Sequence, residues 1–522
     1  MPTPSQKLAA SLAVLQEKQK GERRVFRSSE FTRVHRERLL KNGFLQEVIK
    51  GWLISSSPTA QPGDSTPWYA CFWEFCGLYC SDRFGDEWHL SPEQSLLLHG
   101  ANTVIPTQVV VYSPKGTNNS VSLLFETSIY DLKQPQMPVA SDTTTIDGLR
   151  VFTPATALIR VPDAFFARNP IETQIVLSGL TDTTDVLRQL LEGGRSVVAG
   201  RLAGAFRRIG RAEVADEIVK AMKSAGYDVR ETDPFRPEQA FRVLAQSKSP
   251  LVARIRAMWI GMRETVIETF PKAPGLPRDR NAYLEFVDQI YKSDAYHSLS
   301  IEGYRVTPEI IDRVRSGKWN PNALPDLNTR DALAARGYWQ AFQLVKRAVE
   351  QVITGKNPGT ILRTAHHDWY RELFQPSVAA GLMPASALAG YRNEPVYLRT
   401  SRYVPPRWEA VRDAMGALMG LLEGEPEPGV RAVMGHWLVG YIHPYPDGNG
   451  RMARFVMNLT LASGGFPWTV IRVEDRETYL KALDRASIDS EIAPFSRFVA
   501  ERVRWSTEHG APPTPSQLRP SS

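Results

Sequence analysis

The chain has few of the cysteines on which small secreted domains and many metal sites depend. Only three of its 522 residues are cysteines, and Cys71, Cys76 and Cys80 all fall in one aromatic-rich segment. Positions i, i+5 and i+9 of a helix do not converge on one metal ion. We therefore expect buried thiols in a reducing compartment, with neither a disulfide framework nor a cysteine-bound metal.

Long apolar runs are missing as well. The sequence holds no stretch of 18 uncharged apolar residues, whereas a membrane-spanning helix needs about 20. The first residues, Met1 to Lys7, lack the charged-then-apolar order of a signal peptide. These absences predict a soluble, cytoplasmic protein with no membrane partner.

Charge is concentrated at one end of the chain. With 522 residues and 42% apolar content, the sequence is long enough for two to four domains with their own cores. The net charge is +7, and residues 1–50 hold eleven Lys and Arg against five Glu, so +6 of it lies there. Such localised charge predicts a polyanionic partner for this segment.

The order of elements within this basic segment predicts a winged helix-turn-helix over residues 1–54. An apolar helix around Leu12 is followed by a short element at 28–30, a basic helix at 31–42 and a hairpin at 44–54 that turns at Lys50-Gly51. Duplex DNA is the expected partner, and a module used only for packing or dimerisation is the alternative. The candidate phosphate and base-edge contacts are Arg33, His35, Arg36, Arg38 and Lys41.

The middle of the chain shows no catalytic pattern. After a Ser/Pro/Gly-rich linker at 55–67, residues 68–227 have the mixed pattern of an α/β domain, with a strand-like run at 108–112. The proline-containing stretch 228–237 predicts a hinge to a helical domain at 240–510. Residues 511–522 are expected to form a disordered tail.

The run HPYPDGNGRMAR, His443 to Arg454, gathers side chains that suit phosphate chemistry. Imidazole accepts a proton near neutral pH, a carboxylate holds a hard cation, glycines let backbone N–H groups approach an anion, and guanidinium groups bind phosphoryl oxygens. Apolar residues at helical spacing precede and follow the run, so we expect a helix–loop–helix whose second helix directs its N-terminus at the loop. An ordinary turn would not require Arg451 and Arg454 on the first turns of the second helix.

This run resembles the Fic family signature HxFx(D/E)GNGRxxR, with Tyr445 in place of the usual phenylalanine as its one departure. The resemblance implies that His443 is the catalytic base, that Asp447 binds Mg²⁺, and that ATP is the nucleotide. The intact Gly450 favours AMP transfer, because death-on-curing relatives that transfer phosphate have lysine there. The nucleotide-binding residues implied by the resemblance are Gly448, Asn449, Gly450, Arg451 and Arg454.

Two further segments resemble parts of the same family. Ser298, Glu302 and Gly303 fit the pattern [S/T]xxxE[G/N] of an inhibitory helix, here near 283–303, in which Glu302 would pair with Arg454. A glutamate at a solvated helix end is the alternative. Residues 390–399 resemble the flap hairpin, whose edge would bind a target segment by strand addition through Asn393, Glu394, Pro395, Val396 and Tyr397.

The predicted fold class is a multidomain α+β protein, with an N-terminal winged helix, a mixed α/β middle domain and a mainly α-helical Fic fold with a β-hairpin flap. The front end loosely resembles AbiEi-type antitoxin regulators. The predicted function is transfer of AMP from Mg-ATP to a Ser, Thr or Tyr hydroxyl of a protein, inhibited by Glu302. A transferase with another nucleotide donor, and a DNA-binding regulator of toxin–antitoxin type with a silenced Fic sensor, stay open as alternatives. The sequence leaves self-modification and homo-oligomer formation undecided.

Overall fold

The computed structural model describes residues 3–59, 63–236, 249–318 and 329–510, together with Pro512 and Thr514. The chain divides into an N-terminal unit, Met1–Pro250 with Tyr397–Val404, and a C-terminal unit, Leu251–Val396 with Pro405–Ser522. The predicted tail at 511–522 falls outside the described residues apart from Pro512, whose carbonyl accepts a hydrogen bond from Ser293, and Thr514.

Residues 3–55 form two α-helices, two 3₁₀ turns, the first of them at Lys20–Glu22, and a three-stranded antiparallel sheet of order β1-β3-β2. Thr32 caps the second α-helix through its side chain, and Gly51 supplies the positive φ of +90° that the hairpin turn requires. The predicted helices and hairpin are present, and the first strand is an addition that the sequence did not indicate. The bounds are α1 Pro4–Lys18, β1 Val25–Arg27, the 3₁₀ turn η2 Ser28–Glu30, α2 Arg33–Lys41, β2 Leu45–Ile49 and β3 Trp52–Ser55.

This small module shares its core with the segment that follows. Trp52 and Ile54 are buried in one cluster with Trp68 and Phe75, across the predicted linker. The three cysteines are free and buried in the same cluster. Burial raises the pKa of the Cys80 thiol to about 12, so it stays protonated and unreactive at neutral pH.

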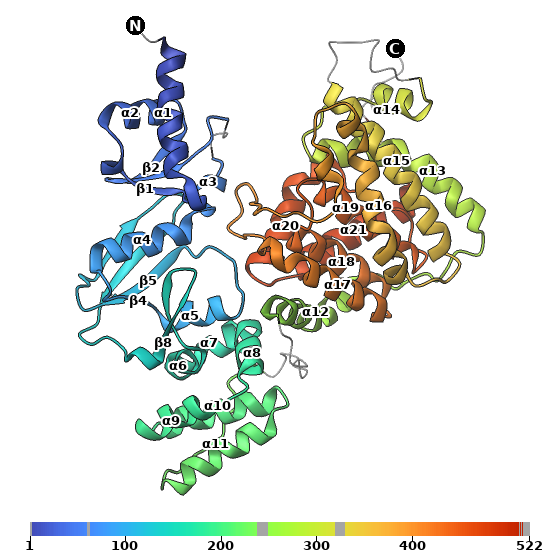
Figure 1. Ribbon diagram of the computed structural model, residues 1–522. Coiled ribbons are helices and arrows are strands. Elements are labelled where there is room, and N and C mark those ends of the chain that lie inside the picture. Colours follow the sequence, from blue (N-terminus) through green and yellow to red (C-terminus); the bar gives the residue numbers. More distant parts are fainter. Residues whose placement is uncertain are drawn as a thin grey trace. The chain divides into compact units, whose positions relative to one another are not determined.

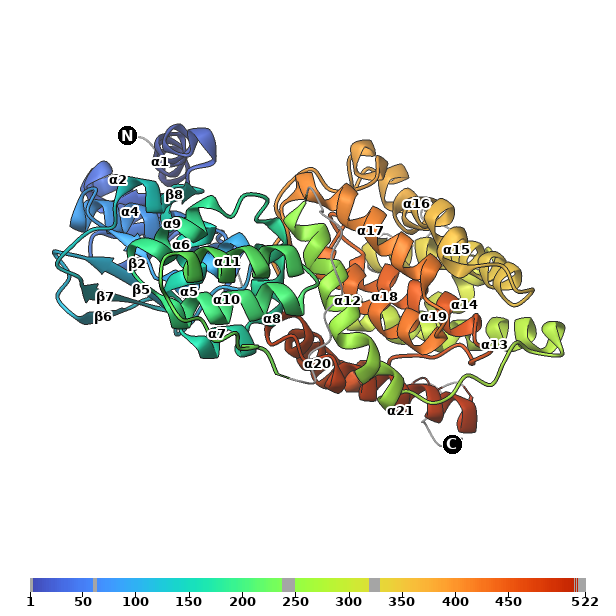
Figure 2. The same cartoon turned by 90° about the horizontal axis from the view of Figure 1, so that it is seen from below.

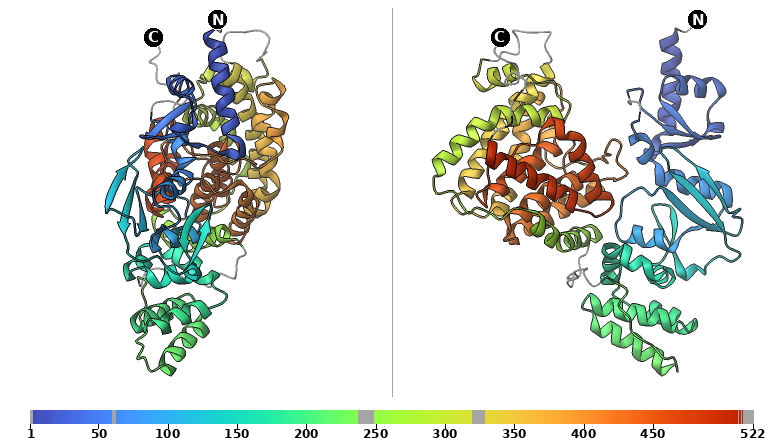
Figure 3. Two further views of the ribbon diagram at one scale, coloured as in Figure 1. Left: turned by 60° about the vertical axis from the view of Figure 1, so that its left-hand side comes forward. Right: turned by 180° about the vertical axis from the view of Figure 1, so that it is seen from behind.

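The rest of the N-terminal unit is a small mixed sheet followed by a helical subdomain (Figure 2). The sheet has the order β4-β5-β7-β6, with β5 and β7 parallel, and a separate hairpin pairs β8 with β9. In Figure 3 the last helices lie at the end of this unit opposite α1. The bounds are α3 Thr66–Tyr69, α4 Phe72–Phe84, β4 His89–Leu90, α5 Pro92–His99, β5 Gln108–Ser113, β6 Asn119–Ser122, β7 Ser128–Lys133, β8 Thr143–Ile146, β9 Leu149–Phe152, α6 Pro154–Arg160, α7 Asp163–Arg168, α8 Pro170–Gly179, α9 Thr184–Glu192, α10 Ser196–Arg208 and α11 Ala212–Ser224.

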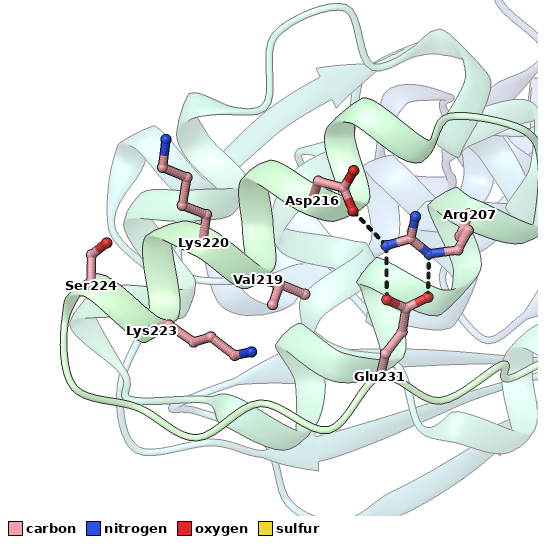
Figure 4. A pocket seen from close by; sticks show the side chains of 7 residues that line it. All are labelled: Arg207, Asp216, Val219, Lys220, Lys223, Ser224 and Glu231. Atoms are coloured by element: carbon pink, nitrogen blue, oxygen red, sulfur yellow. Dashed lines mark hydrogen bonds and ion pairs between the residues drawn. The ribbon is translucent and has the colours of Figure 1, made fainter.

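The described part of the predicted hinge, residues 228–236, packs on α10, and its role as a hinge stays a prediction. A Cβ at Gly204 would lie only 2.0 Å from the Thr232 carbonyl oxygen. The segment can approach α10 this closely because glycine has no side chain. Arg207 fixes the same segment by donating to both carboxylate oxygens of Glu231, at 2.6 and 3.0 Å, beside a surface hollow between α10 and α11 (Figure 4).

The C-terminal unit is helical; inside it α19 packs against α15, α16 and α18, and α18 also packs against α17 (Figure 1). In the described part of the chain, no helix is long and apolar enough to cross a membrane. The bounds are α12 Pro250–Thr269, α13 Arg280–Ile301, α14 Pro308–Arg315, α15 Thr329–Val352, α16 Pro358–Ala379, α17 Val411–Gly424, α18 Pro428–Ile442, α19 Asn449–Ala462, α20 Arg476–Ile488 and α21 Ala493–His509.

The flap, residues 390–399, is an irregular loop, so the predicted β-hairpin is wrong. None of its residues, all of them described, is in a strand. Pro395 has no N–H to donate to a ladder. The carbonyl of Glu394 accepts instead from the Arg392 side chain at 3.0 Å, so a side chain takes the place of a partner strand.

Substitution of Gly204 by alanine should destabilise the N-terminal unit, because the added Cβ meets the backbone of the packed segment. We expect a loss of about 1–3 kcal/mol, as for overpacked cores, measured as a lower midpoint of thermal unfolding by calorimetry. Gly179→Ala is the matched control, since a Cβ at this helix end would meet no atom within 4 Å. Equal midpoints for the two variants would contradict the packing of this segment on α10.

Candidate active site

The loop between α18 and α19 is shaped by two residues with left-handed backbone conformation. His443 follows the last helical residue with φ 51° and ψ 59°, and Gly448 precedes α19 with φ 78° and ψ 8°. A left-handed residue ends a helix sharply, so the chain leaves α18 and returns as α19 within six residues. A histidine in this conformation is uncommon and is kept only where its surroundings fix it.

The imidazole of His443 has one nitrogen engaged and one free to accept a proton. Its Nδ1 lies 3.2 Å from the Gly440 carbonyl oxygen, and because a carbonyl only accepts, Nδ1 carries the hydrogen and Nε2 the lone pair. Burial, together with the nearby charge of Arg392, lowers the pKa of His443 to about 4. The ring is therefore neutral, and able to act as a base, at neutral pH.

Asn449 closes the loop rather than facing a ligand. Its side-chain oxygen accepts from the Tyr445 N–H at 2.9 Å, and its amide nitrogen donates to the Tyr445 carbonyl at 2.8 Å. Both ends of the side-chain amide are in use, so a phosphate contact by Asn449 would be made by its backbone N–H and stays a prediction. The Tyr445 ring stacks on Tyr370 with centroids 4.0 Å apart, and its hydroxyl donates weakly to the His366 carbonyl at 3.5 Å.

The N-terminus of α19 is a ready anion-binding position. The first hydrogen bond of this helix runs from Met452 N–H to the Gly448 carbonyl at 3.0 Å, so the N–H groups of residues 449–451 precede it and have no carbonyl within the helix. A Cβ on Gly450 would lie 2.2 Å from Oε1 of Glu302. A carboxylate of the chain itself thus occupies the space that the missing side chain of Gly450 leaves.

Glu302 and Arg454 form an ion pair at this position, in which the guanidinium is buried and the carboxylate is partly exposed. Arg454 Nη2 lies 2.7 Å from Glu302 Oε1, with side chains 2% and 28% exposed respectively. Arg454 also donates to the Ser298 hydroxyl and carbonyl, at 2.8 and 3.1 Å. Burial opposes the charged form of Glu302, but Arg454 and Arg451 prevail and lower its pKa. The structure therefore brings together Ser298, Glu302 and Arg454, as the sequence predicted.

The end of α13 explains why glycine follows Glu302. The N–H of Gly303 donates to the Ser300 carbonyl at 3.0 Å, and the N–H of Tyr304 donates to the Leu299 carbonyl at 3.1 Å. These two bonds form a Schellman motif, which needs a left-handed residue, and Gly303 has φ +84°. The motif stops the helix directly after Glu302, so the carboxylate projects from the helix end toward α19.

Arg451 lies between two aromatic rings that the sequence did not single out. Its guanidinium carbon is 5.2 Å from the centroid of Tyr304 and 4.9 Å from that of Phe374. Its Nη2 is 3.5 Å from Asp447 Oδ2. The side chain is 1% exposed, and its Nε has no hydrogen-bond partner among the described residues. Aromatic residues at helical spacing are usual in any core, so no sequence signal separates these two from ordinary packing residues.

Asp447 fits the role of a Mg²⁺ ligand that shares the ion with a bound nucleotide. Its side chain is 55% exposed. Among the described residues, no group of three or more His, Cys, Asp or Glu side chains gathers to hold a metal. Mg²⁺ commonly takes one or two carboxylates and completes its shell with water and substrate phosphates, so one accessible carboxylate beside an anion-binding helix end suits it.

The remaining predicted residues lie on exposed segments. Asn393, Glu394 and Pro395 are exposed, Val396 is half-buried, and Tyr397 belongs to the N-terminal unit. On α2 the five candidate DNA contacts differ, and the Nδ1 of His35 lies 2.9 Å from the Ser11 hydroxyl. Arg33 is 82% exposed and pairs with Glu37, Lys41 is exposed, Arg36 donates to the Ser28 carbonyl, and Arg38 donates to the Lys7 carbonyl and the Ser11 hydroxyl at 2.8 Å each.

The segment that contains this loop is similar to proteins of one known family. The model of the Fic/DOC family matches residues 361–461. The chain is 28% identical over 263 residues to "Protein adenylyltransferase Fic" of Nematostella vectensis, covering 50% of this chain and 57% of that protein. It is 33% identical over 121 residues to "Protein adenylyltransferase fic-1" of Caenorhabditis elegans, covering 22% of this chain and 23% of that protein.

The solved structure "Fic-1 (aa134 - 508) from C. elegans" aligns with a TM-score of 0.37 at 17% identity, over 68% of this chain and 90% of that chain. The chain thus spans less than two thirds of the length of the two curated relatives named above. The segment that carries the catalytic loop matches the Fic/DOC family, and its relatives bear the name protein adenylyltransferase.

Proposed function

We propose that this protein is an adenylyltransferase that moves AMP from ATP to a Ser, Thr or Tyr hydroxyl of a protein. The observation that carries the proposal is the six-residue loop between α18 and α19, which begins at His443, whose Nδ1 is bonded to Gly440, and ends at the anion-binding N-terminus of α19. The names of the related proteins support the same reaction. A base next to a phosphate-binding position is the minimum that attack on a phosphoryl group requires.

The reaction follows from the roles of these residues. His443 Nε2 accepts the proton of the target hydroxyl while the hydroxyl oxygen bonds to the α-phosphorus of ATP. The bond between that phosphorus and the α–β bridging oxygen breaks, and diphosphate leaves. The N–H groups of residues 449–451 and the two motif arginines bind phosphate oxygens. Mg²⁺, held by Asp447, would neutralise phosphate charge and help diphosphate depart.

Glu302 is the inhibitory residue of this proposal. Its carboxylate lies over Gly450 and pairs with Arg454, and a terminal phosphate of ATP needs the same position and the same guanidinium. The Glu302 carboxylate and a phosphate cannot occupy this position together, because two like charges in contact repel strongly in a site that bulk water does not screen. ATP that enters while Glu302 stays in place therefore lacks a productive alignment of its α-phosphorus.

As a second function, we propose that residues 1–54 act as a winged helix-turn-helix that binds duplex DNA. On α2, Arg33 is 82% exposed and the neighbouring Val34 is 59% exposed. An exposed cation beside an exposed apolar side chain suits contact with phosphates and thymine methyl groups in a major groove. Arg38 is a weaker candidate than the sequence suggested, because part of its guanidinium bonds within the module.

Replacement of His443 by alanine should abolish AMP transfer and leave ATP binding intact. A positioned base contributes about 10²- to 10⁴-fold, whereas the phosphates bind mainly to α19 and the arginines. Label transfer from ATP is measured in the Glu302→Gly background, and ATP affinity by calorimetry. His509→Ala, an exposed histidine of α21, is the control. Transfer within threefold of the background would exclude His443 as the base.

Substitution of Glu302 should activate the enzyme through Arg454. Glu302→Gly removes the carboxylate and should raise transfer, including any self-modification, by at least about tenfold. Glu302→Gln should raise it less, because a neutral amide still accepts a hydrogen bond from Arg454. Adding Arg454→Ala should cancel the gain, since both changes act through one contact. Intact mass and label incorporation report the outcome.

Glu477→Gln, which removes an exposed carboxylate paired with Lys481 on α20, is the matched control for these variants. It should leave transfer at the wild-type level. Equal transfer by wild type and Glu302→Gly would show that Glu302 does not inhibit the site, whatever the reaction.

The full-length protein should bind duplex DNA with a strong dependence on salt. For each phosphate that a Lys or Arg neutralises, the slope of the logarithm of affinity against the logarithm of salt concentration becomes more negative by about 0.9. Arg33→Ala and Lys41→Ala should therefore each make that slope less steep by about one. Fluorescence anisotropy over a salt series measures it. No binding at low salt, or slopes unchanged in both variants, would assign this module to packing alone.

A further inference from the structure

Arg392 joins the catalytic loop to the flap through a single buried guanidinium. The residue is 3% exposed. Its Nε donates to the His443 carbonyl at 2.8 Å, and its Nη1 donates to the Glu394 carbonyl at 3.0 Å. Its Nη2 donates to the Pro406 carbonyl, where the chain returns from the flap. Its backbone N–H donates to the Pro444 carbonyl at 2.9 Å.

In the catalytic loop, Arg392 bonds to the backbone of His443, the residue with the left-handed conformation. The carbonyls at the end of α18 have no partner within that helix, and His443 itself is left-handed, with φ 51°. The bond from Arg392 Nε satisfies the His443 carbonyl and fixes the peptide plane that follows it. Because Nδ1 is bonded to Gly440, the backbone and the ring of the base are both anchored, and the direction of Nε2 is set.

In the flap, the same guanidinium binds a backbone carbonyl that a neighbouring strand would bind in a β-hairpin. Residues 393–395 are exposed and in no strand, so their backbone depends on side chains for its position. The Glu394 carbonyl bonds to Arg392. The neighbouring Tyr391 hydroxyl bonds to His366 Nε2 at 2.7 Å, and the other nitrogen of that ring is 2.8 Å from the Leu362 carbonyl, which anchors the flap on α16.

We propose that Arg392 is a positioning residue that sets the distance between the base His443 and a target hydroxyl presented by the flap. The inference rests on the proposed function. Arginine suits the task because its planar guanidinium carries five N–H donors in a fixed geometry. A lysine keeps the charge but cannot bond three separate carbonyls in one plane, so it would leave the loop and the flap free to shift relative to each other.

The proposal predicts a difference between two acceptors at one site. When a protein hydroxyl attacks the α-phosphorus, its oxygen must be presented by the flap while His443 accepts its proton. When water attacks the same phosphorus, AMP and diphosphate form and the base still accepts the proton, but no flap is needed. Loosening the flap should therefore lower transfer to protein and spare hydrolysis.

The test compares Arg392→Lys with its parent in the Glu302→Gly background, using full-length protein, Mg-ATP labelled at the α-phosphate, and whichever protein the parent labels, including itself. We expect protein labelling to fall about 10- to 100-fold, the effect of misplacement by about 1 Å. Formation of free AMP and the affinity for ATP should stay within about threefold. Arg263→Lys is the matched control, because Arg263 forms a two-point pair with Glu425 away from the loop and should leave both rates unchanged.

The outcomes separate this inference from the proposed function. If the parent labels no protein, the proposed function fails before Arg392 is in question. If labelling and hydrolysis fall together in Arg392→Lys with an unchanged unfolding midpoint, Arg392 supports the base alone and the positioning role is wrong. Unchanged labelling overturns the inference as well. Should Arg392→Lys fail to fold, Tyr391→Phe removes the hydroxyl that bonds to His366, and it should shift the ratio of labelling to hydrolysis in the same direction.

Discussion

The ion pair between Arg454 and Glu302 is the contact on which the rest of the site depends. Arg454 is 2% exposed, and a buried guanidinium needs a counter-charge because the interior solvates it poorly. Helix α13 supplies that charge from Glu302, and Ser298, one turn earlier on the same face, accepts two further hydrogen bonds from Arg454. A nucleotide that replaced Glu302 in the proposed function would supply the counter-charge of Arg454 through its own phosphates.

In the proposed function, inhibition by Glu302 and binding of ATP are therefore two uses of one position. The helix end and the left-handed Gly303 place the carboxylate where the N-terminus of α19 and the absent side chain of Gly450 leave room for an anion. If the inhibitory contact were closed about 99 times in 100, productive binding of ATP would weaken about 100-fold. A partner that displaced the end of α13 would restore that affinity without any change in the catalytic residues.

The sequence predicted the parts of this site that depend on residue type at fixed spacing. The twelve residues from His443 to Arg454 predicted a helix–loop–helix, and α18 and α19 flank the loop accordingly. The pairing of Glu302 with Arg454, 152 positions apart, followed from a family resemblance alone and is present at 2.7 Å. The sequence could not predict which hydrogen-bond partner each polar side chain takes. The amide of Asn449 closes the loop instead of facing phosphate, and Arg392 replaces strand pairing in the flap, because both outcomes depend on which backbone groups the fold leaves unpaired.

Adenylyl transfer is the central claim, and the fate of the two ends of ATP tests it most directly. The Glu302→Gly protein is incubated in parallel with Mg-ATP labelled at the α-phosphate and with Mg-ATP labelled at the γ-phosphate, together with cell lysate proteins. The account predicts that label from the α-phosphate stays on protein while label from the γ-phosphate is released as diphosphate. Label on protein from the γ-phosphate but none from the α-phosphate would mean phosphate transfer, and would contradict the account.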